Sequence, residues 1–87
     1  MEQFNSEKLK KAIDEFYDVK TKSDKVWARK CFSFIAYNFS DLGIEDISKE
    51  YDAKEALILK DIQDFTKIYL NHRECISDIN QITEKAL

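Results

Sequence analysis

The chain has 87 residues, of which 44% are hydrophobic and 36% charged, with one glycine and no proline. This length suits one domain, and the scarcity of turn residues excludes most all-β folds, so we expect a single all-α domain over residues 1–87. A formal net charge of −3 at pH 7 argues against a general nucleic-acid binder, because such domains are normally basic.

Apolar spacing predicts the first two helices. The first is expected to have its cap at Ser6. Its buried face contains Leu9, Ile13, Phe16 and Tyr17. The second extends from Asp24 to Phe39, and its cap is either Thr21 with Asp24 or Ser23 alone. Apolar residues surround this helix almost completely, so we expect it to form the centre of the core.

Two corners shape the middle of the chain. Gly43 is expected to turn the chain in a backbone conformation that other residues enter reluctantly. A short helix over Ile44–Tyr51 follows, and Asp52, which tolerates left-handed geometry, forms the second corner. The next helix runs from about Ala53 to Leu70, so residues 44–70 are predicted to form a helix-turn-helix.

The last helix completes a small five-helix bundle and is expected to begin at a capping box of Asn71 and Glu74. Its apolar stripe contains Cys75, Ile76, Ile79, Ile82 and Ala86. Cys31 and Cys75 lack the spacing of a zinc site, so we interpret both as buried free thiols of a reducing, cytoplasmic protein. No leader or long apolar run is present, so we expect a soluble, unprocessed chain without membrane contact.

Positive charge is concentrated around the start of the second helix. Its five cations face only Asp24 in this stretch and are Lys20, Lys22, Lys25, Arg29 and Lys30. By contrast, residues 31–52 carry five acidic side chains against Lys49 alone, so a polyanion is expected to approach from one side only. An ordinary solvated charged face is the alternative interpretation.

Four segments carry a resemblance to a known family. They are Ala28-Arg29-Lys30, Phe39-Ser40-Asp41, Gly43-Ile44-Glu45-Asp46-Ile47-Ser48 and Asp52-Ala53-Lys54-Glu55-Ala56-Leu57-Ile58-Leu59. In order, they correspond to an Arg-Gln pair, a Leu-Thr-Asp/Asn segment, a Ser-Leu-Pro-Glu-Ile-Gly helix and a recognition helix that begins Gly-Gly-Arg-Asp-His-Thr-Thr-Val. From about Lys20 to Leu87 the chain thus resembles the C-terminal DNA-binding domain of the bacterial replication initiator DnaA. The resemblance implies a Trp-repressor-like helix-turn-helix fold.

The recognition-helix signature departs from that family. Ala56, Leu57 and Ile58 stand in place of its His-Thr-Thr group, so side chains that donate hydrogen bonds have become hydrocarbons. Lys54 replaces an arginine of the signature, and Arg29 matches the arginine of the Arg-Gln pair. The basic loop of the family has approximate counterparts in Lys20, Lys22 and Lys25. The resemblance therefore implies phosphate contacts without full sequence readout.

Two functional hypotheses remain open. The first is a DNA-binding module for replication or transcription control, with phosphate contacts by Lys20, Lys22, Lys25, Arg29, Lys30 and Lys54. The second is a protein-interaction or self-association module whose docking surface includes Ala53, Ala56 and Leu57. A simpler alternative is that Leu57 faces the last helix.

An enzyme is not expected. The single histidine, His72, has no nucleophile or acid in motif spacing, and the chain has no phosphate loop or two-histidine metal motif. We therefore expect no cofactor, metal or small-molecule substrate.

Overall fold

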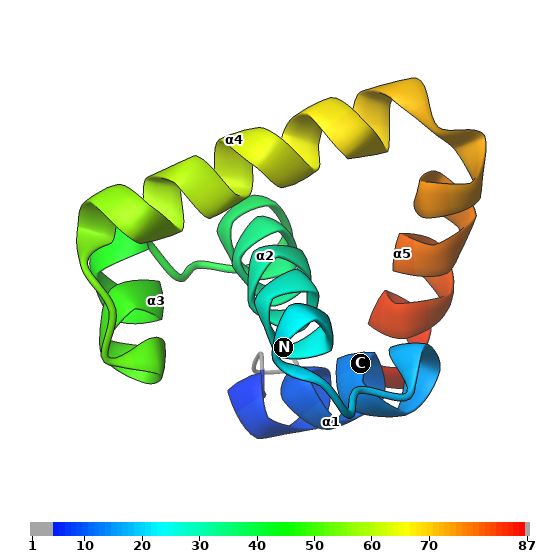
Figure 1. Cartoon of the computed structure of the whole chain (residues 1–87), viewed down its shortest axis with the longest axis horizontal. Helices are drawn as coiled ribbons and strands as arrows, with labels where there is room; N and C mark the ends of the chain where they lie inside the picture. Colours follow the sequence, from blue (N-terminus) through cyan, green and yellow to red (C-terminus); the bar gives the residue numbers. More distant parts are fainter. Residues whose placement is uncertain (1–4, 87) are drawn as a thin grey trace.

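The computed structural model of the protein describes residues 5–86, and these residues form five α-helices. The helices are α1 (Ser6–Tyr17), α2 (Lys22–Phe39), α3 (Ile44–Tyr51), α4 (Glu55–Asn71) and α5 (Arg73–Ala86). In Figure 1, α2 occupies the centre, α1 lies below it, and α4 crosses above it from α3 to α5. The described residues contain no β-strand, so the prediction of an all-α fold with five helices is confirmed.

The first two helices begin at side-chain caps. Asn5 caps α1, because its side-chain oxygen accepts a hydrogen bond from the backbone N–H of Lys8 at 3.0 Å. The expectation of a cap at Ser6 is therefore wrong by one residue. Thr21 and Asp24 form a reciprocal capping box at the start of α2, which confirms the first of the two predicted alternatives.

The corner at Gly43 does not depend on glycine. Gly43 has φ −93° and ψ 177°, an extended conformation open to any residue, so the expected special backbone geometry is wrong. Instead, the carboxylate of Asp46 accepts a hydrogen bond from the Gly43 N–H at 3.0 Å and thereby starts α3. The prediction for Asp52 is confirmed, since it ends α3 in the left-handed region at φ 48° and ψ 46°.

The junction between α4 and α5 differs from the predicted capping box. Asn71 is the last residue of α4, and its side-chain amide donates to the Lys67 carbonyl at 2.7 Å. The backbone carbonyl of His72 accepts from the N–H of Cys75 at 3.1 Å, so the chain turns into α5 without the predicted Asn71–Glu74 pair. The chain changes direction here because His72, between the two helices, has an extended backbone conformation.

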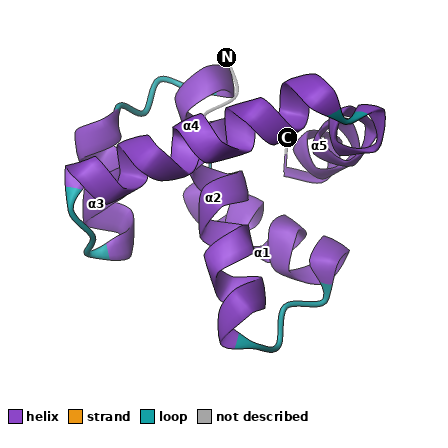
Figure 2. Ribbon diagram, turned by 45° about the horizontal axis from the view of Figure 1, so that its top comes forward, coloured by secondary structure: helices purple, strands orange, loops and turns teal. Residues whose placement is uncertain are grey.

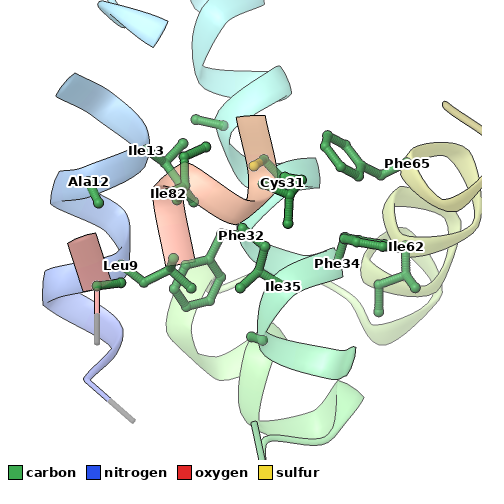
Figure 3. Packing of buried hydrophobic residues seen from close by; sticks show 14 of the residues in the cluster. Leu9, Ala12, Ile13, Cys31, Phe32, Phe34, Ile35, Ile62, Phe65 and Ile82 are labelled. Carbon is green, nitrogen blue, oxygen red and sulfur yellow. The ribbon is translucent and has the colours of Figure 1, made fainter. Parts of the chain in front are cut away.

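The hydrophobic core gathers around the middle of α2. Figure 3 shows Cys31, Phe32 and Ile35 of α2 directed toward Leu9, Ile13 and Ile82, whereas Phe34 faces the side of Phe65 and Ile62. Both cysteines are buried free thiols, as predicted. The prediction that α2 is apolar on nearly every side holds only for its middle, because Val26, Tyr37 and Phe39 are exposed near its two ends. Ile76 of α5 is also exposed, so the apolar stripe predicted there is partly at the surface.

A buried ion cluster joins α2 to α4. Asp61 of α4 is 1% exposed, and its carboxylate accepts from Nε and Nη2 of Arg29 at 2.6 and 3.3 Å. The ammonium of Lys30 lies 3.9 Å from Asp61 and 2.8 Å from the carboxylate of Asp64. A bidentate pair has a fixed geometry, so these contacts determine how α4 is rotated against α2.

Replacing the buried carboxylate tests this cluster. We expect Asp61→Asn to lower the free energy of unfolding by about 3 kcal/mol, because Arg29 loses the charge that compensates its own in a largely buried site. The matched control is Asp64→Asn, at a side chain that is 35% exposed, where solvent screens the pair and the loss of stability should be much smaller. Urea denaturation measures both variants. Equal losses for the two substitutions would contradict the role assigned to Asp61.

Candidate nucleic-acid interface

The outward side of α4 is the longest uncovered helical face next to the predicted turn. Ile58, Asp61, Ile62 and Phe65 are buried toward α2. The opposite side, at helical spacing, consists of the exposed residues Ala56, Lys60, Gln63 and Lys67. Turning the top of the molecule forward in Figure 2 brings α4 in front of α2. We call these four residues the α4 outer stripe.

Three members of the α4 outer stripe are potential hydrogen-bond donors that the sequence analysis did not select. Lys60, Gln63 and Lys67 follow one another at spacings of three and four residues. The signal was available, because these positions lie opposite the apolar positions Ile58 and Ile62. The segment that resembles the signature of the initiator family ends at Leu59, so the resemblance does not point to these residues.

The apolar residues 56–59 at the start of α4 point to different sides of the helix. Ile58 is fully buried, so this position serves the core. Leu57 and Leu59 remain 38% and 43% exposed, and they lie on either side of Ala56 in the helical projection. Leu57 lies in the first turn of α4, whereas α5 joins the other end of α4 in Figure 1, so Leu57 does not face the last helix as the simplest alternative required.

A cleft lies between the start of α2 and the turn that joins α3 to α4. It has a volume of about 490 Å³ and is open to solvent. The residues that line it are Lys10, Asp14, Val19, Lys25, Val26, Ala28, Arg29, Tyr51 and Ala53. The predicted DNA contacts Lys25 and Arg29 therefore lie in one cleft with Ala53, a predicted partner contact.

The six predicted DNA contacts fall into two groups. Arg29 and Lys30 are bound to acidic side chains of α4 and are only about one quarter exposed, at 23% and 22% of their side chains. Lys22, Lys25 and Lys54 are exposed, and within residues 5–86 no carboxylate lies within 4.0 Å of their ammonium groups. Lys20 pairs with Asp18 at 3.2 Å, but both side chains are more than 70% exposed, so solvent screens this pair strongly.

The loop before α2 is fixed by the carboxylate of Asp24. This carboxylate accepts from the backbone N–H groups of Lys20 and Thr21 at 3.1 and 3.0 Å. The two N–H donors stabilise the charged form and lower the pKa of Asp24 below its ordinary value of 3.8. Asp24 thus orders the backbone that carries Lys20 and Lys22.

Negative charge gathers on α3 and its two ends. Glu45, Asp46 and Glu50 are exposed on this helix, and Asp41 and Asp52 are exposed beside it. Lys49 pairs with Glu45 at 3.4 Å, and Lys10 of α1 pairs with Glu50 at 2.9 Å, so part of this charge is compensated. The remaining carboxylates disfavour the approach of an anionic partner to this side of the molecule.

We also searched the described residues for a metal site, a nucleophilic cysteine and a membrane-spanning helix. Within them, no three His, Cys, Asp or Glu side chains gather in a way that could hold a metal ion. Burial raises the pKa of the Cys31 thiol far above its ordinary value, which opposes formation of a nucleophilic thiolate. No helix in residues 5–86 combines the length and apolar character needed to cross a bilayer.

Comparisons of this chain with protein-family models, with curated proteins and with solved structures found no significant match. The resemblance to the initiator domain, the functional hypotheses and the cytoplasmic location therefore stay predictions.

The titration of two carboxyl groups tests the electrostatics of this interface. Asp24 and Asp64 should both titrate below 3.8, because backbone N–H groups stabilise the first carboxylate and Lys30 stabilises the second. Their pKa values are lowered in the folded protein, so each contributes stability above the unfolded pKa and loses it as the pH falls through the folded value. Carboxyl-carbon NMR measures this, with the urea-unfolded chain as control. A folded value at or above the unfolded one would contradict these contacts.

Proposed function

We propose that this domain binds double-stranded DNA, with α3 and α4 acting as a helix-turn-helix. In this proposal α4 enters the major groove, which is wide enough to admit an α-helix. The lysines before and within the start of α2, with Lys54 at the turn, contact phosphates and hold the helix there. The resemblance to the replication-initiator domain suggests a role in replication or transcription control.

The main support is the position of the unpaired lysines relative to α4. Lys25 lines the same cleft as Ala53, which directly precedes Lys54 and the start of α4. Cations from two distant parts of the sequence thus flank the end of one outward-facing helix. Phosphates run along both edges of the major groove, so a helix in the groove needs positive charge beside it.

The ion cluster changes the role proposed for two of the predicted phosphate contacts. Arg29 and Lys30 already bind Asp61 and Asp64, and a phosphate would have to compete with the buried carboxylate of Asp61 and the partly exposed one of Asp64. We therefore assign them the positioning of α4, and we assign the phosphate contacts to Lys20, Lys22, Lys25 and Lys54. Lys60 and Lys67 of the α4 outer stripe extend the same positive surface.

The salt dependence of DNA binding tests this proposal. In fluorescence anisotropy with a random-sequence duplex, log K should fall linearly with log salt, because binding releases counterions. Lys25→Gln and Lys54→Gln should each weaken binding and reduce the slope by about 0.9, the value for one phosphate contact. Lys85→Gln on α5 is the matched control, because Figure 1 places the end of α5 beside α1, on the opposite side of α2 from α4. Absence of binding at low salt would refute the proposal.

Protein docking is the second candidate, and the exposed hydrocarbon at the start of α4 favours it. Leu57 and Leu59 keep 38% and 43% of their surface in water, which costs free energy unless a partner covers them. On this hypothesis Ala53, Ala56 and Leu57 bind a protein or a second copy of the chain. Sedimentation over a wide concentration range should then reveal a dimer that Leu57→Ser weakens, whereas a persistent monomer would remove self-association.

A further inference from the structure

The exposed hydrocarbon at the start of α4 has no role in the core of the protein. Ile58 alone among residues 56–59 is buried, and it fills the position against the interior completely. Ala56, Leu57 and Leu59 occupy exposed positions in the first two turns of α4, together with Glu55 and Lys60. A helix surface that served only solubility would carry polar side chains at these positions.

A lysine lies on each side of these apolar residues along the helix. Lys54 precedes it and Lys60 follows it, both exposed, while Glu55 is the only acidic residue between them. The surface therefore combines a net positive charge with apolar side chains. A matching partner must be anionic and must also present small apolar groups at the depth of the helix.

The major groove of DNA meets both requirements. Its phosphates are anionic, and its floor carries one apolar feature, the 5-methyl group of thymine. Alanine and leucine side chains contact such methyl groups but cannot satisfy the hydrogen-bonding groups of guanine or cytosine, whose desolvation is unfavourable. A groove lined by G·C pairs therefore opposes this helix.

We propose that Ala56, Leu57 and Leu59 contact thymine 5-methyl groups, so that the domain prefers T-rich duplexes. This inference rests on the proposed function. Ala56 leads the α4 outer stripe and faces the groove floor, and the two leucines contact methyl groups to either side. Gln63, two turns further along the same stripe, is able to pair with an adenine edge, which favours A·T pairs as well.

Removing the methyl groups from the DNA tests the inference without altering the protein. An alternating A·T duplex is compared with the same duplex in which deoxyuridine replaces thymidine, at equal salt. Affinity should fall about fourfold for each contacted thymine, the equivalent of ~0.8 kcal/mol for one buried methyl-sized group. Equal binding to both duplexes would overturn the inference and leave the proposed function intact. Absence of binding to either would remove both.

Substitutions in α4 connect the effect to these side chains. The double variant Leu57→Ala with Leu59→Ala should show a clearly smaller difference in affinity between the two duplexes, because the leucine contacts with the methyl groups are lost and that of Ala56 remains. Leu70→Ala is the matched control, since Leu70 is 72% exposed on the same helix but far from its start, and it should preserve the difference. A difference that is undiminished in the double variant would overturn the assignment, as would a dimer that this variant dissociates in the absence of any thymine preference.

Discussion

The buried carboxylate of Asp61 is the contact on which the geometry of this protein depends. The apolar face of α4, with Ile58, Ile62 and Phe65, turns toward the core, but the hydrophobic effect is not directional and tolerates small rotations of α4 against α2. The bidentate contact with Arg29, together with Lys30, selects one orientation. That orientation turns Ile58 and Phe65 inward and leaves the α4 outer stripe free. The buried ion pair thus contributes to the choice of the side of α4 that faces solvent.

The same contact redistributes the charge of the domain. Two cations that are adjacent to the basic loop in sequence are withdrawn into the interface between α2 and α4. Of the predicted phosphate contacts that remain, Lys25 lines the cleft that also contains Ala53, the residue before Lys54, and the exposed carboxylates of α3 precede this turn in the chain. A protein with an overall negative charge therefore keeps a local positive surface, which is the physical basis of the proposed function.

The sequence was sufficient for features that depend on neighbours along the chain. Helical periods, the Thr21–Asp24 box and the left-handed Asp52 are local, and each was predicted. The prediction for Gly43 is wrong because glycine as a residue type suggested a special backbone conformation. In the structure, Asp46 supplies an ordinary cap for the start of α3. The acidic partners of Arg29 and Lys30 lie more than 30 residues away in the sequence and leave no local pattern. Only the folded structure therefore shows that these two cations do not belong to the candidate interface. Lys60, Gln63 and Lys67 were recoverable from periodicity alone.

The burial of the ion cluster also separates two responses to the ionic atmosphere. At moderate ionic strength the screening length is about 10 Å, so mobile ions weaken contacts between exposed lysines and phosphates. They do not penetrate to Asp61, which has almost no contact with solvent. Increasing the electrolyte concentration should therefore release a bound polyanion from a domain whose tertiary structure is unchanged. On the proposed function, DNA binding and folding therefore respond to different parts of the same set of charges.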